Sequence, residues 1–261
     1  MRALSIAATG MLAQQLNVEV ISNNIANMNT TGYKRQRAEF QDLLYQNIKR
    51  IGSTSSENGE ILPTGVQIGA GVKTGAVYRI TSQGDLATTG NTYDVAINGK
   101  GYFRIQLPNG NDAYTRDGTF QVSPQGQLVT ANGYVVSPGI TVPQDARDVT
   151  INAAGEILVS IDGQVTPSNV GRLELVTFFN EAGLEAVGDN MFLETPASGP
   201  ANVGSPGTIG FGSLLQGFVE TANVNSVQEI TALITAQRAY EMNSKVISTA
   251  DEMLSSTANI R

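Results

Sequence analysis

Carboxylates are the side chains through which this chain could carry out chemistry. Its 261 residues include no His and no Cys, which excludes imidazole bases, thiol nucleophiles and Cys/His zinc sites. Asp112 with Asp117, or Asp94 with Asp117, has the residue types of a glycosidase acid and base. Asp117 and Asp162 each precede Gly, however, which is typical of turns where Asp bonds to neighbouring backbone. We therefore predict no catalytic residue, no metal site and no cofactor.

A glycine-rich stretch suggests a second kind of chemistry, phosphate binding. Gly69, Gly71 and Gly75 surround a Lys-Thr pair. Val72 stands where a phosphate-binding loop needs Gly, and no strand–helix–strand pattern surrounds the stretch. We interpret these glycines as serving turns and close backbone contacts.

The overall charge limits the kinds of partner. The formal net charge is −7 and the pI is about 4.7, so nucleic acid is not an expected partner. No apolar run approaches the ~18 residues of a membrane span, so we expect a protein that is not membrane-embedded. Residues 1–13 contain one Arg and a short apolar stretch, but the helical pattern continues through Gln14, Gln15 and Asn17. We therefore expect no cleavable signal peptide.

The longest predicted element is a helix over residues 226–261. Ser226 and Glu229 form a capping box at its start. Apolar side chains then recur every seven residues, and a row of mainly small side chains follows three positions after each, as in a coiled coil. The two rows contain Leu233, Tyr240, Ile247 and Leu254, and Ala236, Asn243 and Ala250.

The N-terminal stretch repeats this pattern. Leu4, Met11, Val18 and Ile25 are seven residues apart, and Ile21 belongs to the row three positions later. We expect the two terminal helices to pair, in either direction, into a coiled-coil-like arm. The C-terminal stripe is wider than a two-helix seam requires, which predicts that further copies of the chain cover the rest.

Residues 76–222 have the signals of β-structure. Short apolar runs flank the turn dipeptides Asn98-Gly99, Asp117-Gly118 and Asn132-Gly133, which predicts a hairpin at each. Strands 157–161 and 173–176 continue the series around Asp162-Gly163. Turns at this spacing favour an antiparallel sandwich or barrel.

The predicted fold class is therefore α+β, with paired N- and C-terminal coiled-coil-like helices and a mainly antiparallel β domain inserted between them. We expect an N-terminal helix in 1–34, an extended or partly helical connecting segment in 35–75, a β domain in 76–205, a return segment in 206–225 and the C-terminal helix in 226–261.

Residues 22–34 first indicate a helix exit, because the stretch is rich in Asn and Gly32 can take a positive φ. The stretch also resembles the N-terminal signature of the bacterial flagellar axial proteins, the rod and hook family. Residues 94–138, 216–225 and 237–245 resemble further parts of that family. The signature residues are Ser22, Asn23, Asn24, Ala26, Asn27, Thr30, Gly32, Tyr33 and Lys34.

The resemblance implies a structural, non-enzymatic subunit that polymerises helically into the drive shaft of the flagellum. Residues of about 45–63 resemble the insertion by which distal rod proteins differ from hook proteins, which favours a distal rod subunit. The alternatives are a proximal rod or hook-type axial subunit and, more remotely, a secreted β-rich glycan-binding or glycan-cleaving protein. The implied location is the periplasm-spanning rod of the basal body. The implied partners are further copies, proximal rod proteins, the hook protein, the L-ring and P-ring proteins and the flagellar export apparatus.

Overall fold

The computed structural model describes residues 2–49, 64–162 and 166–259. The chain forms two compact units, each assembled from segments that are distant in the sequence. Unit 1 comprises Met1–Ile25, Gln36–Tyr78 and Ser226–Arg261, and unit 2 comprises Ala26–Arg35 and Arg79–Asn225. The chain therefore passes between the units four times, after residues 25, 35, 78 and 225.

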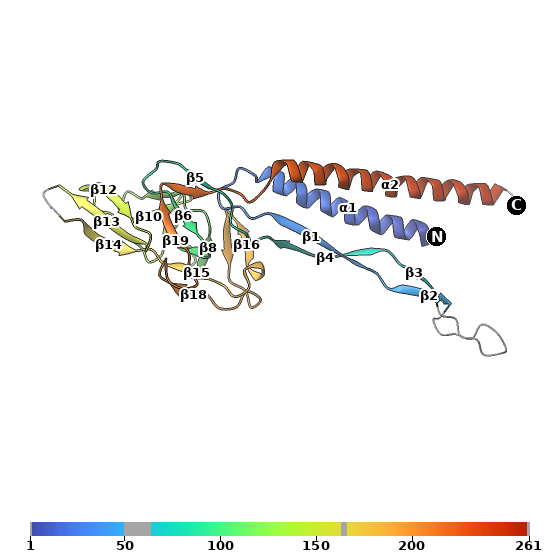
Figure 1. The fold of residues 1–261 in the computed structure, drawn as a ribbon, viewed down its shortest axis with the longest axis horizontal. Helices are drawn as coiled ribbons and strands as arrows, with labels where there is room; N and C mark the ends of the chain where they lie inside the picture. Colours follow the sequence, from blue (N-terminus) through green and yellow to red (C-terminus); the bar gives the residue numbers. More distant parts are fainter. Residues whose placement is uncertain (1, 50–63, 163–165, 260–261) are drawn as a thin grey trace. The chain divides into compact units, whose positions relative to one another are not determined.

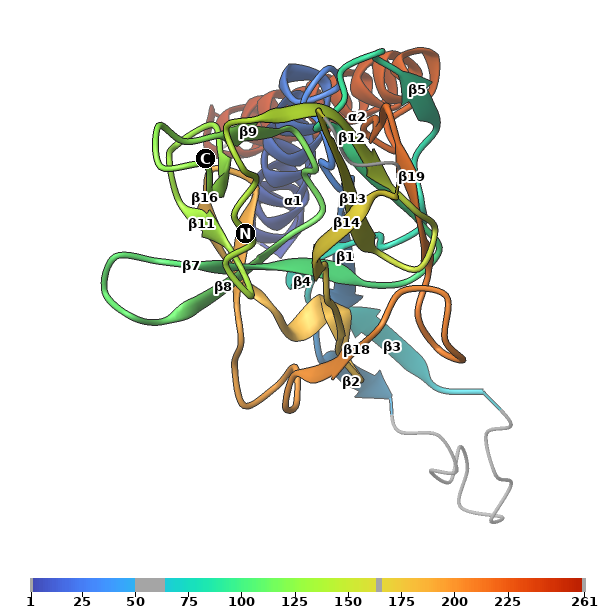
Figure 2. The ribbon, with the colours of Figure 1, turned by 90° about the vertical axis from the view of Figure 1, so that its left-hand side faces the viewer.

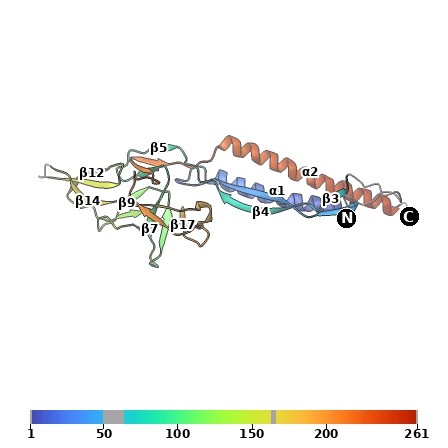
Figure 3. The same ribbon diagram turned by 60° about the horizontal axis from the view of Figure 1, so that its bottom comes forward.

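The helices of unit 1 are α1 (Arg2–Ala26) and α2 (Ser226–Asn259), and they lie side by side (Figures 1 and 3). Asn24, near the end of α1, contacts Glu229, near the start of α2, at 3.1 Å. Gly10 lies against Asn243, much farther along α2. The pair is therefore antiparallel, which decides a direction that the sequence pattern left open. With 34 residues against 25, α2 continues past the start of α1.

The described part of 35–75 contains strands, so the segment expected to be extended or partly helical is extended there. β1 (Gln36–Asp42) pairs with β4 (Val72–Arg79), and β2 (Tyr45–Lys49) pairs antiparallel with β3 (Val66–Gly69). Along the first five residues of β1, half-buried and exposed side chains alternate. This period of two is that of a strand. Of the expected insertion 45–63, residues 50–63 lie outside the described residues.

Gly71 joins these strands to α1. The N–H of Val72 donates to the Thr9 hydroxyl at 3.3 Å. Gly71 has a φ of +122°, and a Cβ on it would lie 2.2 Å from the same hydroxyl oxygen. The prediction that this glycine serves a close contact is confirmed.

Unit 2 consists mainly of short strands, several of which are labelled in Figure 2. Its elements are β5 (Leu86–Thr88), β6 (Val95–Asn98), β7 (Tyr102–Gln106), β8 (Asp112–Thr115), β9 (Phe120–Val122), β10 (Leu128–Thr130), β11 (Val135–Val136), β12 (Ala146–Ile151), β13 (Glu156–Ile161), β14 (Ser168–Arg172), β15 (Leu175–Thr177), the 3-10 helix η1 (Glu181–Gly183), β16 (Glu185–Gly188), β17 (Met191–Leu193), β18 (Asn202–Gly204), β19 (Ser213–Gln216) and β20 (Phe218–Glu220).

Strand β7 is the centre of the largest sheet. It pairs antiparallel with β8 on one side, and with β11 and β15 on the other. Its side chains alternate between two cores, because Phe103 packs in one cluster and Tyr102 in the other. The first cluster also takes in β6, β12, β13 and β19, and the second takes in Tyr114, Phe178 and Phe192. The mainly antiparallel β-structure is therefore confirmed, although the unit includes residues 26–35 and continues to 225.

Two of the expected hairpins are wrong, and tertiary contacts explain both. β6 pairs with β19, in the register Leu214 with Ile97, so the Asn98-Gly99 turn does not join β6 to β7. β8 pairs with β7 and β17, while β9 pairs with β10, so Asp117-Gly118 is not a hairpin turn either. Gly118 instead packs on β6, where a Cβ on it would lie 1.8 Å from the Val95 carbonyl oxygen.

The hairpin at Asn132-Gly133 is confirmed, since β10 pairs with β11. After Ile161 the chain returns as β14, which pairs with β13. The expected strand 173–176 belongs to β15, in the larger sheet. The segment 206–225, expected as a return segment, contributes β19 and β20.

Candidate functional site

The carboxylates that could have formed a catalytic pair have local partners, in turns for Asp94 and Asp117 and at the surface for Asp112. One oxygen of Asp117 accepts hydrogen bonds from the N–H of Thr119 at 3.0 Å and from its hydroxyl at 2.8 Å. Asp94 accepts from Asn91 at 2.9 Å. Asp112 lies 3.7 Å from Arg104 at the protein surface. These are the local backbone and surface roles that the sequence favoured.

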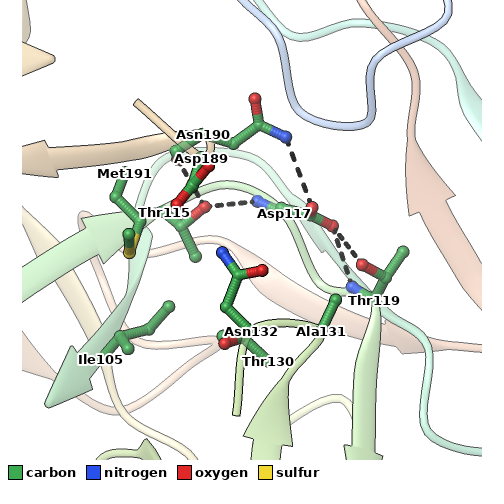
Figure 4. A pocket seen from close by; sticks show the side chains of 10 residues that line it. All are labelled: Ile105, Thr115, Asp117, Thr119, Thr130, Ala131, Asn132, Asp189, Asn190 and Met191. Carbon is green, nitrogen blue, oxygen red and sulfur yellow. Dashed lines mark hydrogen bonds between the residues drawn. The ribbon is translucent and has the colours of Figure 1, made fainter. Parts of the chain in front are cut away.

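Figure 4 shows the pocket beside Asp117, which has a volume of about 220 Å³. Its lining is mostly hydroxyl, amide and carboxylate side chains, and Asn190 reaches Asp117 at 3.5 Å. Asn190 also donates to the Thr31 carbonyl at 3.1 Å, so it ties this wall to the end of the signature. Across the described residues, no group of three or more acidic side chains is arranged to hold a metal ion.

The side chain of the signature residue Asn24 makes the pair of hydrogen bonds to the backbone of β1 that a neighbouring strand would otherwise make. Its side-chain amide donates to the Gln36 carbonyl and accepts from the Gln36 N–H, both at 2.8 Å. The same amide donates to Glu229 at 3.1 Å. Asn24 and Glu229 are both buried, so the end of α1, the start of β1 and the start of α2 share one polar cluster.

The rest of the signature forms a turn and then a buried charge. Thr30 bonds to Asn27 through both its backbone N–H and its hydroxyl. Gly32 takes a φ of +68°, where a Cβ would lie 2.9 Å from the backbone nitrogen of Asp117. Ser22, Asn23 and Ala26 are exposed and Tyr33 is half-buried, whereas Lys34 is 3% exposed.

Lys34 belongs to a buried ionic cluster with Glu220 and Arg116, all within unit 2. The Lys34 ammonium lies 2.6 Å from one oxygen of Glu220, and the Arg116 guanidinium lies 2.6 Å from the other. Arg116 also donates to the carbonyls of Gly99 at 2.9 Å and Gly101 at 2.7 Å. Both oxygens of the Glu220 carboxylate are thus bound, one by Lys34 and the N–H of Gly84 and the other by Arg116.

Charge and burial act in opposite directions on this cluster. Burial raises the pKa of Glu220, but Arg116 and Lys34 outweigh it and hold the pKa below its usual value. Burial lowers the pKa of Lys34, and the attraction of Glu220 only partly compensates. Sequence reasoning missed Arg116 and Glu220. The available signal was a Glu directly after two apolar residues of a short strand, Phe218 and Val219.

The predicted heptad residues lie along the two helices with different exposures. Ile21, Ala236 and Ala250 are buried within unit 1. Tyr240 and Leu254 are 43% and 42% exposed. The half-buried members are Leu4, Met11, Val18, Ile25, Leu233, Asn243 and Ile247.

Further apolar side chains on α2, outside the two heptad rows, are also exposed. Val227, Ile230 and Ile234 are 71%, 50% and 45% exposed. Met242, Val246 and Met253 are 64%, 48% and 61% exposed. At 100° per residue, Val227 and Ile234 lie on the side of α2 opposite to the buried Ala236. In the described part of the chain, neither helix is long and apolar enough to cross a membrane.

Comparison with known proteins accounts for these features together. Residues 4–34 match the family model of the flagella basal body rod protein, 96–159 that of the flagellar hook protein FlgE/F/G D1 domain, and 215–260 that of the flagellar basal body rod FlgEFG protein C-terminal region. The flagellar basal-body rod protein FlgG of Caulobacter vibrioides is 64% identical over 261 residues, all of both chains. The chain belongs to the flagellar basal-body rod protein family.

Other relatives match this chain over nearly its full length. FlgG of Agrobacterium fabrum is 54% identical over 98% of this chain and 97% of its own. FlgG of Borreliella burgdorferi is 46% identical over 100% and 99%. The chain is thus a structural subunit of the flagellar basal-body rod, at the distal position, as the sequence predicted. Lys34 and Glu220 lie within the N- and C-terminal matched regions, and Arg116 lies within the middle one.

Proposed function

We propose that this rod subunit assembles into a helical polymer through the apolar face of α2 that α1 leaves uncovered. The carrying observation is the set of six apolar side chains on α2, from Val227 to Met253, that are 45–71% exposed. Exposed apolar side chains grouped on one element mark a surface that another protein covers. Copies of the chain are the simplest occupants, because a shaft built of one subunit must bury this face against itself.

The contacts in such a polymer are heterologous. A two-fold interface uses the same patch on both subunits and closes on itself, whereas a shaft must keep growing. The face around Val227 and Ile234 therefore meets a different surface of its neighbour. A groove beside the helix pair, lined by Val18 of α1 and Tyr240 of α2 among others, is a candidate for that surface.

The ribbon of β2 and β3 supplies a second contact surface. Leu44, Tyr45 and Ile48 are 88%, 55% and 55% exposed, and Val66 is 46% exposed. A two-stranded ribbon without a covered apolar face is marginally stable in water. A neighbouring subunit that covers these side chains would both order the ribbon and resist sliding between subunits. This supports the proposal that the segment from residue 45 contacts neighbours in the rod.

Within the basal body, we place the subunit between proximal rod proteins and the hook protein, inside the L-ring and P-ring proteins, after delivery by the flagellar export apparatus. The family models that match are named for both rod and hook proteins, which supports contacts of one kind along the shaft. The proposed function contains no catalytic step, which agrees with the local turn roles of Asp94 and Asp117.

Substituting the uncovered face tests the assembly proposal. As a monomer, the double variant Val227→Ser and Ile234→Ser should have a free energy of unfolding within about 0.5 kcal/mol of the wild-type value, because both side chains are already exposed. Its polymerisation should need at least about tenfold higher protein concentration, because buried apolar area is lost at every contact. Sedimentation of polymer over a concentration series measures this threshold.

Val187 on β16 provides the matched control, because it is 47% exposed but belongs to unit 2. Val187→Ser should leave the threshold unchanged. Polymerisation of the double variant at the wild-type concentration would reject the face of α2 as an assembly surface.

A further inference from the structure

The buried ionic cluster removes three charged side chains from water. Lys34, Arg116 and Glu220 are 3%, 5% and 1% exposed, and they bring two cations to one anion. Taking charges out of water is costly, and apolar side chains of similar size often stabilise a protein as well or better. The ionic groups add geometric specificity, because their hydrogen bonds hold the bonded residues at fixed relative positions.

The partners of the cluster are the segments of unit 2 through which the chain enters and leaves it. Lys34 lies on segment 26–35 and donates to the Ser82 carbonyl at 2.9 Å. Glu220 lies on the segment that leads to residue 225, and it accepts from the N–H of Gly84 at 2.9 Å. Arg116 belongs to the interior of the β unit.

Backbone contacts join the same segments directly. The N–H of Gly32 donates to the Glu220 carbonyl at 2.8 Å, and that of Ile80 donates to the Arg35 carbonyl at 2.8 Å. Asn223 accepts from the N–H of Arg35 at 2.7 Å and donates to the Ile80 carbonyl at 2.8 Å. Segments 30–35, 79–84 and 218–223 thus form one bundle, and the ionic cluster lies within it.

We propose that Lys34, Glu220 and Arg116 form a clamp that fixes the three connecting segments of unit 2 to one another and to the β unit. Lys34 and Glu220 lock the segments together. Arg116 anchors them through the carbonyls of Gly99 and Gly101. The clamp acts by position: it keeps the segments next to three of the chain's four passages between the units, after residues 35, 78 and 225, in a single register, so that a force applied to one connecting segment is shared by the others.

Amide hydrogen exchange on the full-length monomer distinguishes such a clamp from a general stabilising role. The main variant is Lys34→Met, which leaves Arg116 and Glu220 as a balanced pair. Its global unfolding midpoint should stay close to that of the wild type. The amides of Gly32, Arg35 and Ile80 should exchange about tenfold faster under native conditions, because the segments open locally.

Reference amides lie elsewhere in unit 2, where Leu128 donates to Ile140 and Leu173 donates to Gly155. They should change less than about twofold in Lys34→Met. Glu174→Gln is the matched control, since it removes a partly exposed ion pair with Arg104 at 3.0 Å. It should leave both sets of amides unchanged.

Glu220→Gln is the second variant and keeps the shape of the side chain while leaving two cations without their counter-charge. It should accelerate the connecting-segment amides more than Lys34→Met does. Equal acceleration of connecting and reference amides in both variants would overturn the clamp, and so would unchanged exchange of the connecting amides in both. These measurements need no polymer, so they stand apart from the assembly proposal.

Discussion

The β unit and the helix pair bury their apolar side chains to very different extents. In unit 2, Ile97, Phe103 and Leu175 are fully buried, and the core continues across several strands. On the described part of α2, Ala236 and Ala250 are the buried apolar residues, while Ile234 and Met242 remain 45% and 64% exposed. Unit 2 therefore completes its own core, whereas the helix pair leaves apolar surface exposed. One chain thus combines a β unit with a fully buried core and a helix pair whose apolar side chains are only partly buried.

The strongest way to break this comparison is to remove a core side chain of unit 2. Phe103→Ala deletes a ring that packs edge-on against Phe120, with centroids 5.0 Å apart. We expect a loss of about 3–5 kcal/mol in the free energy of unfolding, because the cavity cannot fully collapse. Denaturant titration of the monomer, followed by β-sheet circular dichroism, measures it. A loss below about 1 kcal/mol would mean that unit 2 is not a self-sufficient core.

Overpacking the helix pair should have a smaller effect on the monomer and a large one on the polymer. Ala236 is 2% exposed and lines a groove with Asn17 of α1. Ala236→Leu forces the helices apart at a cost of about 1–3 kcal/mol. We expect faster exchange of α1 and α2 amides, unchanged exchange in unit 2, and impaired polymerisation. Ser244→Leu, at an exposed position of α2 that lines neither this groove nor the one around Tyr240, is the control.

Acid should weaken unit 2 through Glu220. The folded-state pKa of Glu220 lies below the ordinary value of 4.5, because Arg116 and Lys34 outweigh the effect of burial. Its contribution to stability is therefore complete above pH 4.5 and is lost as the pH falls through the folded-state pKa. Unfolding titrations between pH 7 and 3 should show the stability advantage of wild type over Glu220→Gln shrinking below pH 4.5. A constant difference across that range would contradict this assignment.

The smallest monomer effect is expected at the ribbon. Leu44→Ser with Ile48→Ser should change the unfolding free energy by no more than about 0.5 kcal/mol, since both side chains are exposed. Rods built from this variant should nevertheless bend more easily under flow in electron or fluorescence microscopy. Rods as stiff as wild type would restrict the assembly surface to the helices.

Sequence patterns predicted those features that depend on local periodicity. The heptads located α1 and α2, and the short apolar runs located β6 to β11, β13 and β15, whereas β5, β12, β14 and β16 to β20 were not singled out. Strand partners were less predictable. The Asn98-Gly99 signal for a hairpin was overridden because Leu214, more than a hundred residues later, supplies the partner of Ile97. Nothing local to β6 encodes that pairing.

The ionic cluster shows the same limit at the level of single residues. Lys34 was recognised as part of a signature string, and its burial against Glu220 was not. A lysine ending an Asn- and Thr-rich turn reads as a solvated charge, since Lys is almost never buried without a partner. Glu220 can be identified as the partner of Lys34 only from the folded structure, in which β20 lies beside the turn.

The distance along the chain between Lys34 and Glu220 also has a consequence in time. They are separated by 186 residues. At a synthesis rate of roughly 5–20 residues per second, Lys34 leaves the ribosome roughly 10–40 s before Glu220. Contacts between such distant residues also close slowly, because the entropy of a long loop must be overcome first. A newly made chain therefore spends its early life with the contact between Lys34 and Glu220 not yet formed and its β unit still open.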